Sequence, residues 1–177
     1  SGQILIDGID YQDRTLHSFR NQMGVILQSP HLFSGTVRDN IVFGLENISD
    51  QKVVDTLQLI GADSLAEKLN LEVGEEGSNL SNGERQLVSF ARAIIKEPAI
   101  LVMDEATSSI DTITEAKIQK GINTIIKGRT SIIIAHRLST IKNCDRIVVI
   151  ENGAIQEMGT HNELMEAGGH YANLYKG

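Results

Sequence analysis

Three short apolar runs punctuate the chain, and stretches with helical periodicity separate them. The runs are residues 23–28, 99–103 and 131–135, with a helix expected between the last two at about residues 111–126. Strands that are apolar on both faces are typical of parallel sheets, which are covered on both sides. The alternation of runs and helices therefore predicts an α/β fold with a parallel sheet.

Two further segments predict antiparallel pairs. Residues 3–8 alternate between apolar and polar positions and then turn, as an edge strand and its hairpin do. Residues 151–153 end in Asn152 and Gly153, and this dipeptide is a strong signal for a hairpin turn. The sheet region is thus expected to carry an antiparallel β edge.

Residues 36 to about 68 change period and predict a helical insertion. Apolar residues recur at helical spacing within residues 37–42. Asp50 stands where it can cap a further helix, which Gly61 would close. A helical block among strand–helix units predicts an α/β core with a helical lobe.

Composition and charge disfavour several classes of protein. The 177 residues are 41% hydrophobic and carry a net charge of −7 without a basic cluster, which argues against a nucleic-acid surface. The apolar runs are far shorter than the ~20 residues of a membrane helix. Cys144 is the only cysteine, so an intrachain disulfide is excluded and a cytosolic setting is favoured.

Residues 80–86, Leu-Ser-Asn-Gly-Glu-Arg-Gln, combine a helix start with features of an anion site. Ser81 and Glu84 have the spacing of a capping box, which predicts a helix from this point to about Lys96. The start of a helix presents unpaired N–H groups and the positive end of its dipole. A phosphate group would fit there.

The second chemical signal is the apolar run that ends in Asp104 and Glu105. P-loop NTPases hold Mg²⁺ through an aspartate in this position and place an acidic residue beside the attacking water. The ordinary alternative is a pair of strand-end carboxylates that face solvent. Together, and in this order, the two segments favour a phosphate-handling site.

On these motifs the chain resembles the nucleotide-binding domain of ABC transporters, of the exporter type with fused membrane and ATPase domains. Residues 80–86 resemble the family signature, residues 100–105 the Walker B strand and residues 108–111 the D-loop. Gln28 matches the Q-loop glutamine, and His136 matches the switch histidine. The resemblance implies a P-loop NTPase-like ABC ATPase core with an inserted helical subdomain.

Other segments are similar to exporters in particular. Residues 34–41 and 73–77 are similar to segments that contact the coupling helices of the membrane domain, and residues 159–175 resemble an exporter carboxyl end. The resemblance implies that residues 1–177 form the C-terminal portion of an ATPase domain, with the helical subdomain at about 35–96. It also implies a location at the cytoplasmic face of a membrane.

The resemblance gives each strand-end residue a role. Asp104 would hold Mg²⁺, Gln28 would complete the magnesium shell, and Glu105 would act as general base toward the attacking water. His136 would bond the γ-phosphate region and hold the water in register, although a lone histidine after a strand is more often a surface or core residue. Asp111 would serve the nucleotide site, a helix N-cap, or both.

The signature residues Ser81, Asn82, Gly83 and Glu84 would grip ATP seated on a second ABC ATPase domain, so that two sites form when two domains close head to tail. Asn82 stands where glycine is usual, and Glu84 where glutamine is usual. A carboxylate beside phosphate is unfavourable unless Glu84 folds back onto the Ser81 amide. That conformation is expected here.

One departure from the family outweighs the rest, because no Gly-x-x-x-x-Gly-Lys-[Ser/Thr] occurs in the chain. Loss of three charge-assisted bonds of ~1.5–3 kcal/mol each would weaken ATP binding about a thousandfold or more. The chain is expected to be truncated at its N-terminus and inactive alone. Unpaired strand edges, an exposed apolar face, and self-association, element swapping or loss of order near residues 23–28 and 131–135 are expected with it.

The function implied for the full-length protein is an ATPase that drives export of a substrate chosen by its membrane helices. A first alternative is a chromosome-maintenance or DNA-repair ATPase, which predicts coiled-coil arms and a basic surface that the sequence lacks. A second is a non-catalytic interaction module. ATP and Mg²⁺ are the implied cofactors, with no nucleic-acid partner.

Overall fold

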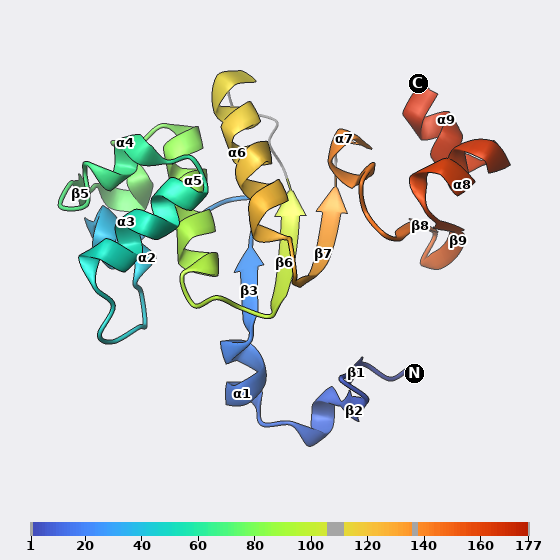
Figure 1. Cartoon of the computed structure of the whole chain (residues 1–177), viewed down its shortest axis with the longest axis horizontal. Helices are drawn as coiled ribbons and strands as arrows, with labels where there is room; N and C mark the ends of the chain where they lie inside the picture. The colour runs from blue at the N-terminus through green and yellow to red at the C-terminus, as the bar shows by residue number, and fades with distance from the viewer. Residues whose placement is uncertain (1, 106–111, 136–137, 177) are drawn as a thin grey trace. The chain divides into compact units, whose positions relative to one another are not determined.

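The computed structural model describes residues 2–105, 112–135 and 138–176, in two compact units that divide after Ile134. The sheet of the first unit has the strand order β3-β6-β7, from Met23–Ile26, Ile100–Glu105 and Thr130–Ala135. The three arrows point the same way in Figure 1, and β3 pairs with β6 in parallel. The predicted parallel sheet is confirmed, although β3 ends at Ile26, before Gln28.

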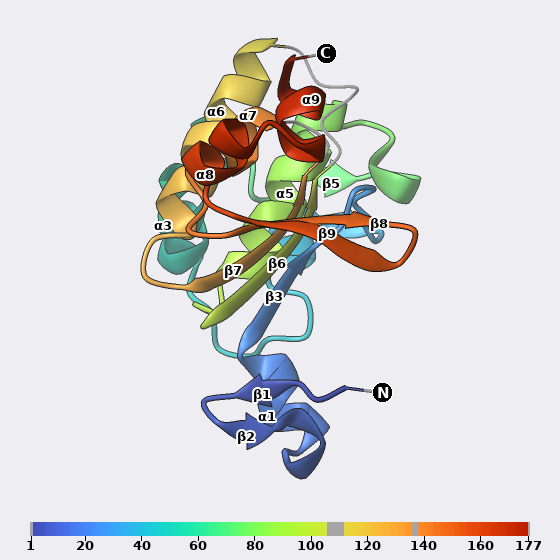
Figure 2. The same cartoon turned by 90° about the vertical axis from the view of Figure 1, so that its right-hand side faces the viewer.

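Helices cover one face of this sheet. Helix α5 (Asn82–Ile94) packs against β3, and α6 (Thr112–Ile125) lies on the same side of the strands as α3 (Asp50–Leu59; Figure 2). Gly24 of β3 is required by this packing, because a Cβ atom there would lie 2.7 Å from the carbonyl oxygen of Ala93. Such an approach is too close for any side chain.

The opposite face of the sheet is open within the first unit. Val25, Ile132 and Ile134 are 46%, 55% and 54% exposed, whereas Leu101 and Met103 on the helix side are buried. The prediction of a covered strand at residues 23–28 is therefore wrong at Val25, and the expected exposed apolar face is confirmed. Self-association, element swapping and loss of order near these strands stay predictions.

The helical insertion is confirmed by α2 (Val37–Ile41), α3 (Asp50–Leu59) and α4 (Asp63–Ala66). Their apolar faces join the core of the first unit together with α5. The cap of α3 differs from the prediction, because Ser49 accepts the bond from the Lys52 amide at 3.2 Å. Asp50 is the first helical residue and pairs with Arg38 instead.

Short antiparallel pairs complete the first unit. Strands β1 (Leu5–Ile6) and β2 (Ile9–Asp10) form the predicted hairpin, and β4 (Gly35–Thr36) pairs with β5 (Glu72–Val73). Helix α1 (Leu16–Asn21) follows the hairpin and leads into β3. Two 3₁₀ turns lie at Tyr11–Asp13 and Glu75–Gly77.

The second unit is a hairpin with helices. Strands β8 (Ile147–Glu151) and β9 (Ala154–Gly159) are antiparallel. Helix α7 (Leu138–Ile141) precedes them in the chain, and α8 (His161–Ala167) and α9 (His170–Lys176) follow. The turn residues Asn152 and Gly153 have φ values of 53° and 75°, the left-handed pair that a two-residue hairpin needs. The predicted turn is confirmed. In the part of the chain that the structure describes, no helix has the length and apolarity to cross a membrane.

Candidate nucleotide site

The start of α5 is closed by the predicted capping box. The Ser81 Oγ accepts a hydrogen bond from the Glu84 amide at 3.2 Å, and the Ser81 amide donates to Glu84 Oε2 at 2.9 Å. Both bonds join residues three positions apart, so they need no contact with the rest of the fold. The helix therefore begins at Asn82 for a local reason.

The unusual Glu84 is accommodated in the way the sequence suggested. Its carboxylate folds back onto the Ser81 amide, and its second oxygen lies 3.9 Å from the Lys68 Nζ. Asn82 accepts a hydrogen bond from Arg85, whose guanidinium also donates to the Gly77 carbonyl at 3.3 Å. The negative charge of Glu84 is thus turned toward its own helix end and a lysine.

The four signature residues are placed differently with respect to solvent. Ser81 and Asn82 are exposed, Glu84 is half-buried, and Gly83 is buried. A ligand can reach the first two side chains directly. The amides at the first helical positions lack partners within the helix, which makes this end suited to an anion.

The end of β6 holds the second part of the site. Asp104 is half-buried, and the backbone of β6 continues through Glu105. The side chain of Glu105 lies outside the described residues, as do Asp111 and His136. Their predicted roles remain predictions.

Strand register relates Gln28 to Asp104. Ile26 of β3 is opposite Met103 of β6; Asp104 is the next residue of β6, and Gln28 lies two residues beyond the end of β3. Gln28 is exposed at this edge. The structure therefore brings these two predicted magnesium ligands to one edge, which is where ligands bind open parallel sheets.

The start of α5 and the end of β6 lie toward the same end of the first unit. A short loop joins the end of α5 to the start of β6, and the two elements run in opposite directions in Figure 1. The helix start and the strand end therefore face the same way but lie on separate elements.

A polar network that includes the segment after Gln28 was missed from the sequence. Arg92 of α5 donates to the His31 carbonyl at 2.8 Å and to the Asn40 carbonyl at 2.6 Å. The only local signal is an arginine within an otherwise apolar stretch of α5. Its partners lie 61 and 52 residues away, beyond the reach of spacing arguments.

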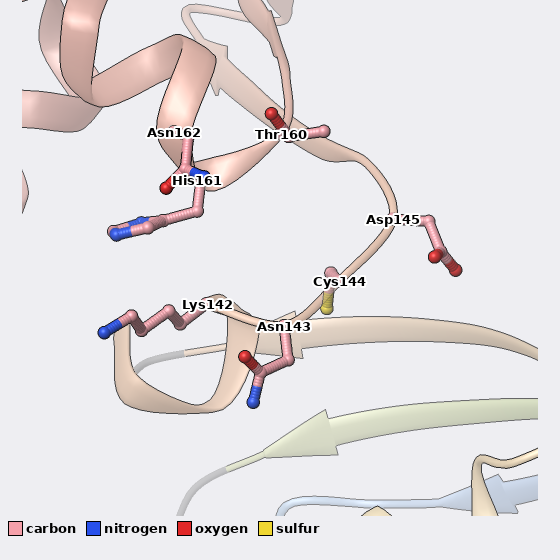
Figure 3. A pocket seen from close by; sticks show the side chains of 7 residues that line it. All are labelled: Lys142, Asn143, Cys144, Asp145, Thr160, His161 and Asn162. Atoms are coloured by element: carbon pink, nitrogen blue, oxygen red, sulfur yellow. The ribbon is translucent and has the colours of Figure 1, made fainter.

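The second unit has a hollow of about 360 Å³, shown in Figure 3. Its lining consists of Lys142, Asn143, Cys144, Asp145, Thr160, His161 and Asn162. Burial, and then the charge of Asp145, raise the pKa of the Cys144 thiol, which disfavours the thiolate. His161 is engaged with the Tyr171 hydroxyl at 2.8 Å. The hollow therefore lacks an activated nucleophile.

Comparison with known proteins gives consistent matches. The family profile described as ABC transporter matches residues 1–108. Over 179 aligned residues the chain is 51% identical to the uncharacterized ABC transporter ATP-binding protein YknV of Bacillus subtilis (strain 168), covering 99% of this chain and 30% of that protein.

A second relative from the same organism, the probable multidrug resistance ABC transporter ATP-binding/permease protein YheH, is 47% identical, covering 99% of this chain and 27% of that protein. Among solved structures, a bacterial Atm1-family ABC exporter with ATP bound matches with a TM-score of 0.91 and 39% identity. That match covers 99% of this chain and 32% of the exporter chain. The chain thus spans less than a third of the length of each of these proteins.

Proposed function

Since the chain belongs to the ABC transporter family, we propose that it is the C-terminal portion of an ATPase domain that powers export across a membrane. The observation that carries the proposal is the register of β3 against β6. Ile26 pairs with Met103, so the segments that carry Gln28 and Asp104 leave the same edge of a parallel sheet. The capped start of α5 supports it, because a helix N-terminus favours phosphate.

The donor set suits Mg²⁺. Asp104 offers a carboxylate and Gln28 an amide oxygen, which are the hard ligands that this ion prefers. Within the described residues, no group of three or more His, Cys, Asp or Glu is placed to hold a metal ion. Two protein ligands are typical for Mg²⁺ in NTPases, where water and phosphate oxygens complete the shell.

The proposed division of labour follows the chemistry of each residue. Asp104 and Gln28 would hold the cation, and a bound Mg²⁺ would supply positive charge beside the phosphates. Glu105 accepts a proton from the attacking water, and His136 orients that water and the γ-phosphate region. Asp111, in the segment that resembles the D-loop, would serve the nucleotide site, a helix N-cap, or both.

The signature end of α5 is proposed to act on a different nucleotide. Ser81, Asn82, Gly83 and Glu84 would contact ATP held by a second ABC ATPase domain in a head-to-tail dimer. The phosphate cradle itself would come from sequence outside these 177 residues, because the chain has no Gly-x-x-x-x-Gly-Lys-[Ser/Thr]. Residues 34–41 and 73–77 would contact the coupling helices of a membrane domain, which puts the site at the cytoplasmic face.

The test is ATP hydrolysis by the full-length protein in lipid vesicles. Glu105→Gln keeps the shape of the side chain and removes the base, so kcat should fall by at least about a hundredfold. Glu46→Gln, at an exposed position outside the site, is the matched control and should leave kcat unchanged. Normal hydrolysis by the Glu105→Gln protein would refute the assignment of the base.

A further inference from the structure

The guanidinium of Arg92 joins helix α5 to two other segments. Its Nη1 donates to the His31 carbonyl at 2.8 Å, its Nε to the Asn40 carbonyl at 2.6 Å, and its Nη2 to the Asn40 Oδ1 at 2.9 Å. His31 lies in the segment that follows β3, and Asn40 lies in α2. One side chain of α5 thus holds both.

Asn40 makes this junction rigid. Its side chain is 1% exposed, and its Oδ1 also accepts from the Phe33 amide at 2.8 Å. Its Nδ2 donates to the carbonyls of Phe33, at 2.8 Å, and Thr36, at 3.1 Å. Both donors and both lone pairs of this amide are therefore used.

The surroundings of Arg92 make its geometry difficult to replace. Burial lowers the pKa of Arg92, yet arginine stays charged at neutral pH. Its Cζ lies 5.2 Å from the centroid of the Phe33 ring, which stacks on Phe43 with centroids 4.4 Å apart. A planar fork can meet three acceptors and an aromatic face together, whereas the ammonium of a lysine is a single point of charge.

The position of the network gives it a functional meaning. The segment held at His31 and Phe33 begins with Gln28, and the start of α5 carries the signature residues. We propose that Arg92 is a positioning residue that makes the segment after Gln28 move together with α5. This inference rests on the proposed ATPase function and adds to it a link between the two nucleotide-facing ends.

The physical reason is the cost of breaking the network. Hydrogen bonds to a charged group contribute more than neutral ones, and a half-buried guanidinium left without acceptors is penalised further. When α5 shifts on binding nucleotide at its start, His31 is carried with it. The side chain of Gln28 then changes its position relative to Asp104.

The experiment uses the full-length protein and a double-mutant cycle between Arg92→Lys and Gln28→Ala. Alone, Arg92→Lys should lower kcat for ATP about tenfold and change KM by less than about twofold, because positioning is lost while binding groups remain. In the Gln28→Ala background the same substitution should lower kcat by less than about twofold. If Arg92 acts by positioning Gln28, its substitution cannot lower kcat much further once the Gln28 side chain has been removed.

A matched control separates this from a general loss of packing. Arg129 also donates to backbone carbonyls, those of Pro98 and Ile125, but does not touch the segment after Gln28. Arg129→Lys should change kcat by the same factor, close to one, in the unsubstituted protein and in the Gln28→Ala protein. A second measurement, hydrogen exchange by mass spectrometry, should show faster exchange in residues 29–36 for Arg92→Lys and not for Arg129→Lys.

The outcomes are distinct. The inference would be overturned if Arg92→Lys lowered kcat equally with and without the Gln28 side chain, or if hydrogen exchange in residues 29–36 stayed unchanged. Either result would leave the proposed ATPase function standing. A full-length protein that fails to hydrolyse ATP before any substitution would instead overturn the proposed function. Arg92→Lys protein that hydrolyses ATP at the unsubstituted rate would also reject the role of Arg92.

Discussion

The two ends of helix α5 are held by different means. Its start is fixed by Ser81 and Glu84, which bond to each other across three positions. Its later part is fixed by Arg92, whose acceptors lie 52 and 61 residues away in the chain. The start is exposed and can meet a ligand, whereas the later part ties the helix to the lobe and to the segment after β3.

The difference fits the proposals that this helix binds a nucleotide at its start and moves the segment after Gln28 through Arg92. The two bonds of the capping box join Ser81 and Glu84 alone, so the cap itself does not depend on distant segments. Long-range bonds in the later part have no such independence, and any displacement of the helix is shared with His31 and Asn40.

The largest effect on stability is expected at the long-range end. Asn40→Ala removes the partner of Phe33 and leaves part of the Arg92 guanidinium unpaired in a half-buried site, so the free energy of unfolding should fall by about 3 kcal/mol. Urea unfolding of the 177-residue chain measures it. Asn123→Ala, at an exposed position of α6, is the control and should change stability by less than about 0.5 kcal/mol. Similar losses in both variants would mean that the network contributes little.

A smaller effect is expected at the local end. Ser81→Ala removes the acceptor for the Glu84 amide and should lower the free energy of unfolding by about 1 kcal/mol. The comparison variant is Ser64→Ala, at an exposed position inside α4, where no cap is lost. If Ser81→Ala destabilised the chain as much as Asn40→Ala, the distinction between the two ends would fail.

The smallest effect concerns a second capping box, at the start of α2. The Thr36 amide and hydroxyl donate to Asp39 Oδ2 at 3.0 and 2.7 Å, and these bonds lower the pKa of Asp39. A folded pKa below the unfolded one gives stability that is present above about pH 4 and is lost as pH falls through the folded pKa.

Asp39→Asn should therefore reduce the loss of stability between about pH 5 and about pH 3. The measurement is the urea midpoint of both proteins across that range. Asp63→Asn, at the start of α4 where no side chain caps the helix, is the control. An identical acid dependence for Asp39→Asn and the unsubstituted chain would show that this cap does not contribute.

Several features of the fold follow from neighbouring residues and were predictable for that reason. The Ser81–Glu84 cap and the Asn152–Gly153 turn depend on bonds and torsions within a few positions. The cap of α3 was assigned wrongly to Asp50, since Ser49 and Asp50 are adjacent cap-forming residues and only the backbone geometry selects Ser49.

Features that depend on the far side of an element were not predictable in the same way. An apolar strand such as β3 does not show which face a helix will cover, so the exposure of Val25 differs from the prediction of two covered faces. Gly24 is needed only because the backbone of Ala93 approaches it. At the candidate site, order along the chain identified Gln28 and Asp104, and pairing of β3 with β6 was needed to put them at one edge.

By itself, the sequence determined the helix start at Asn82, the hairpin turn and the family to which the chain belongs, because these depend on residue types at short, fixed spacings. Only the tertiary structure decided that Arg92 reaches His31 and Asn40, and that one face of the sheet is left open within the first unit. The physical reason is that hydrogen bonds and packing between distant segments depend on how the chain returns upon itself, which spacing along the sequence does not record.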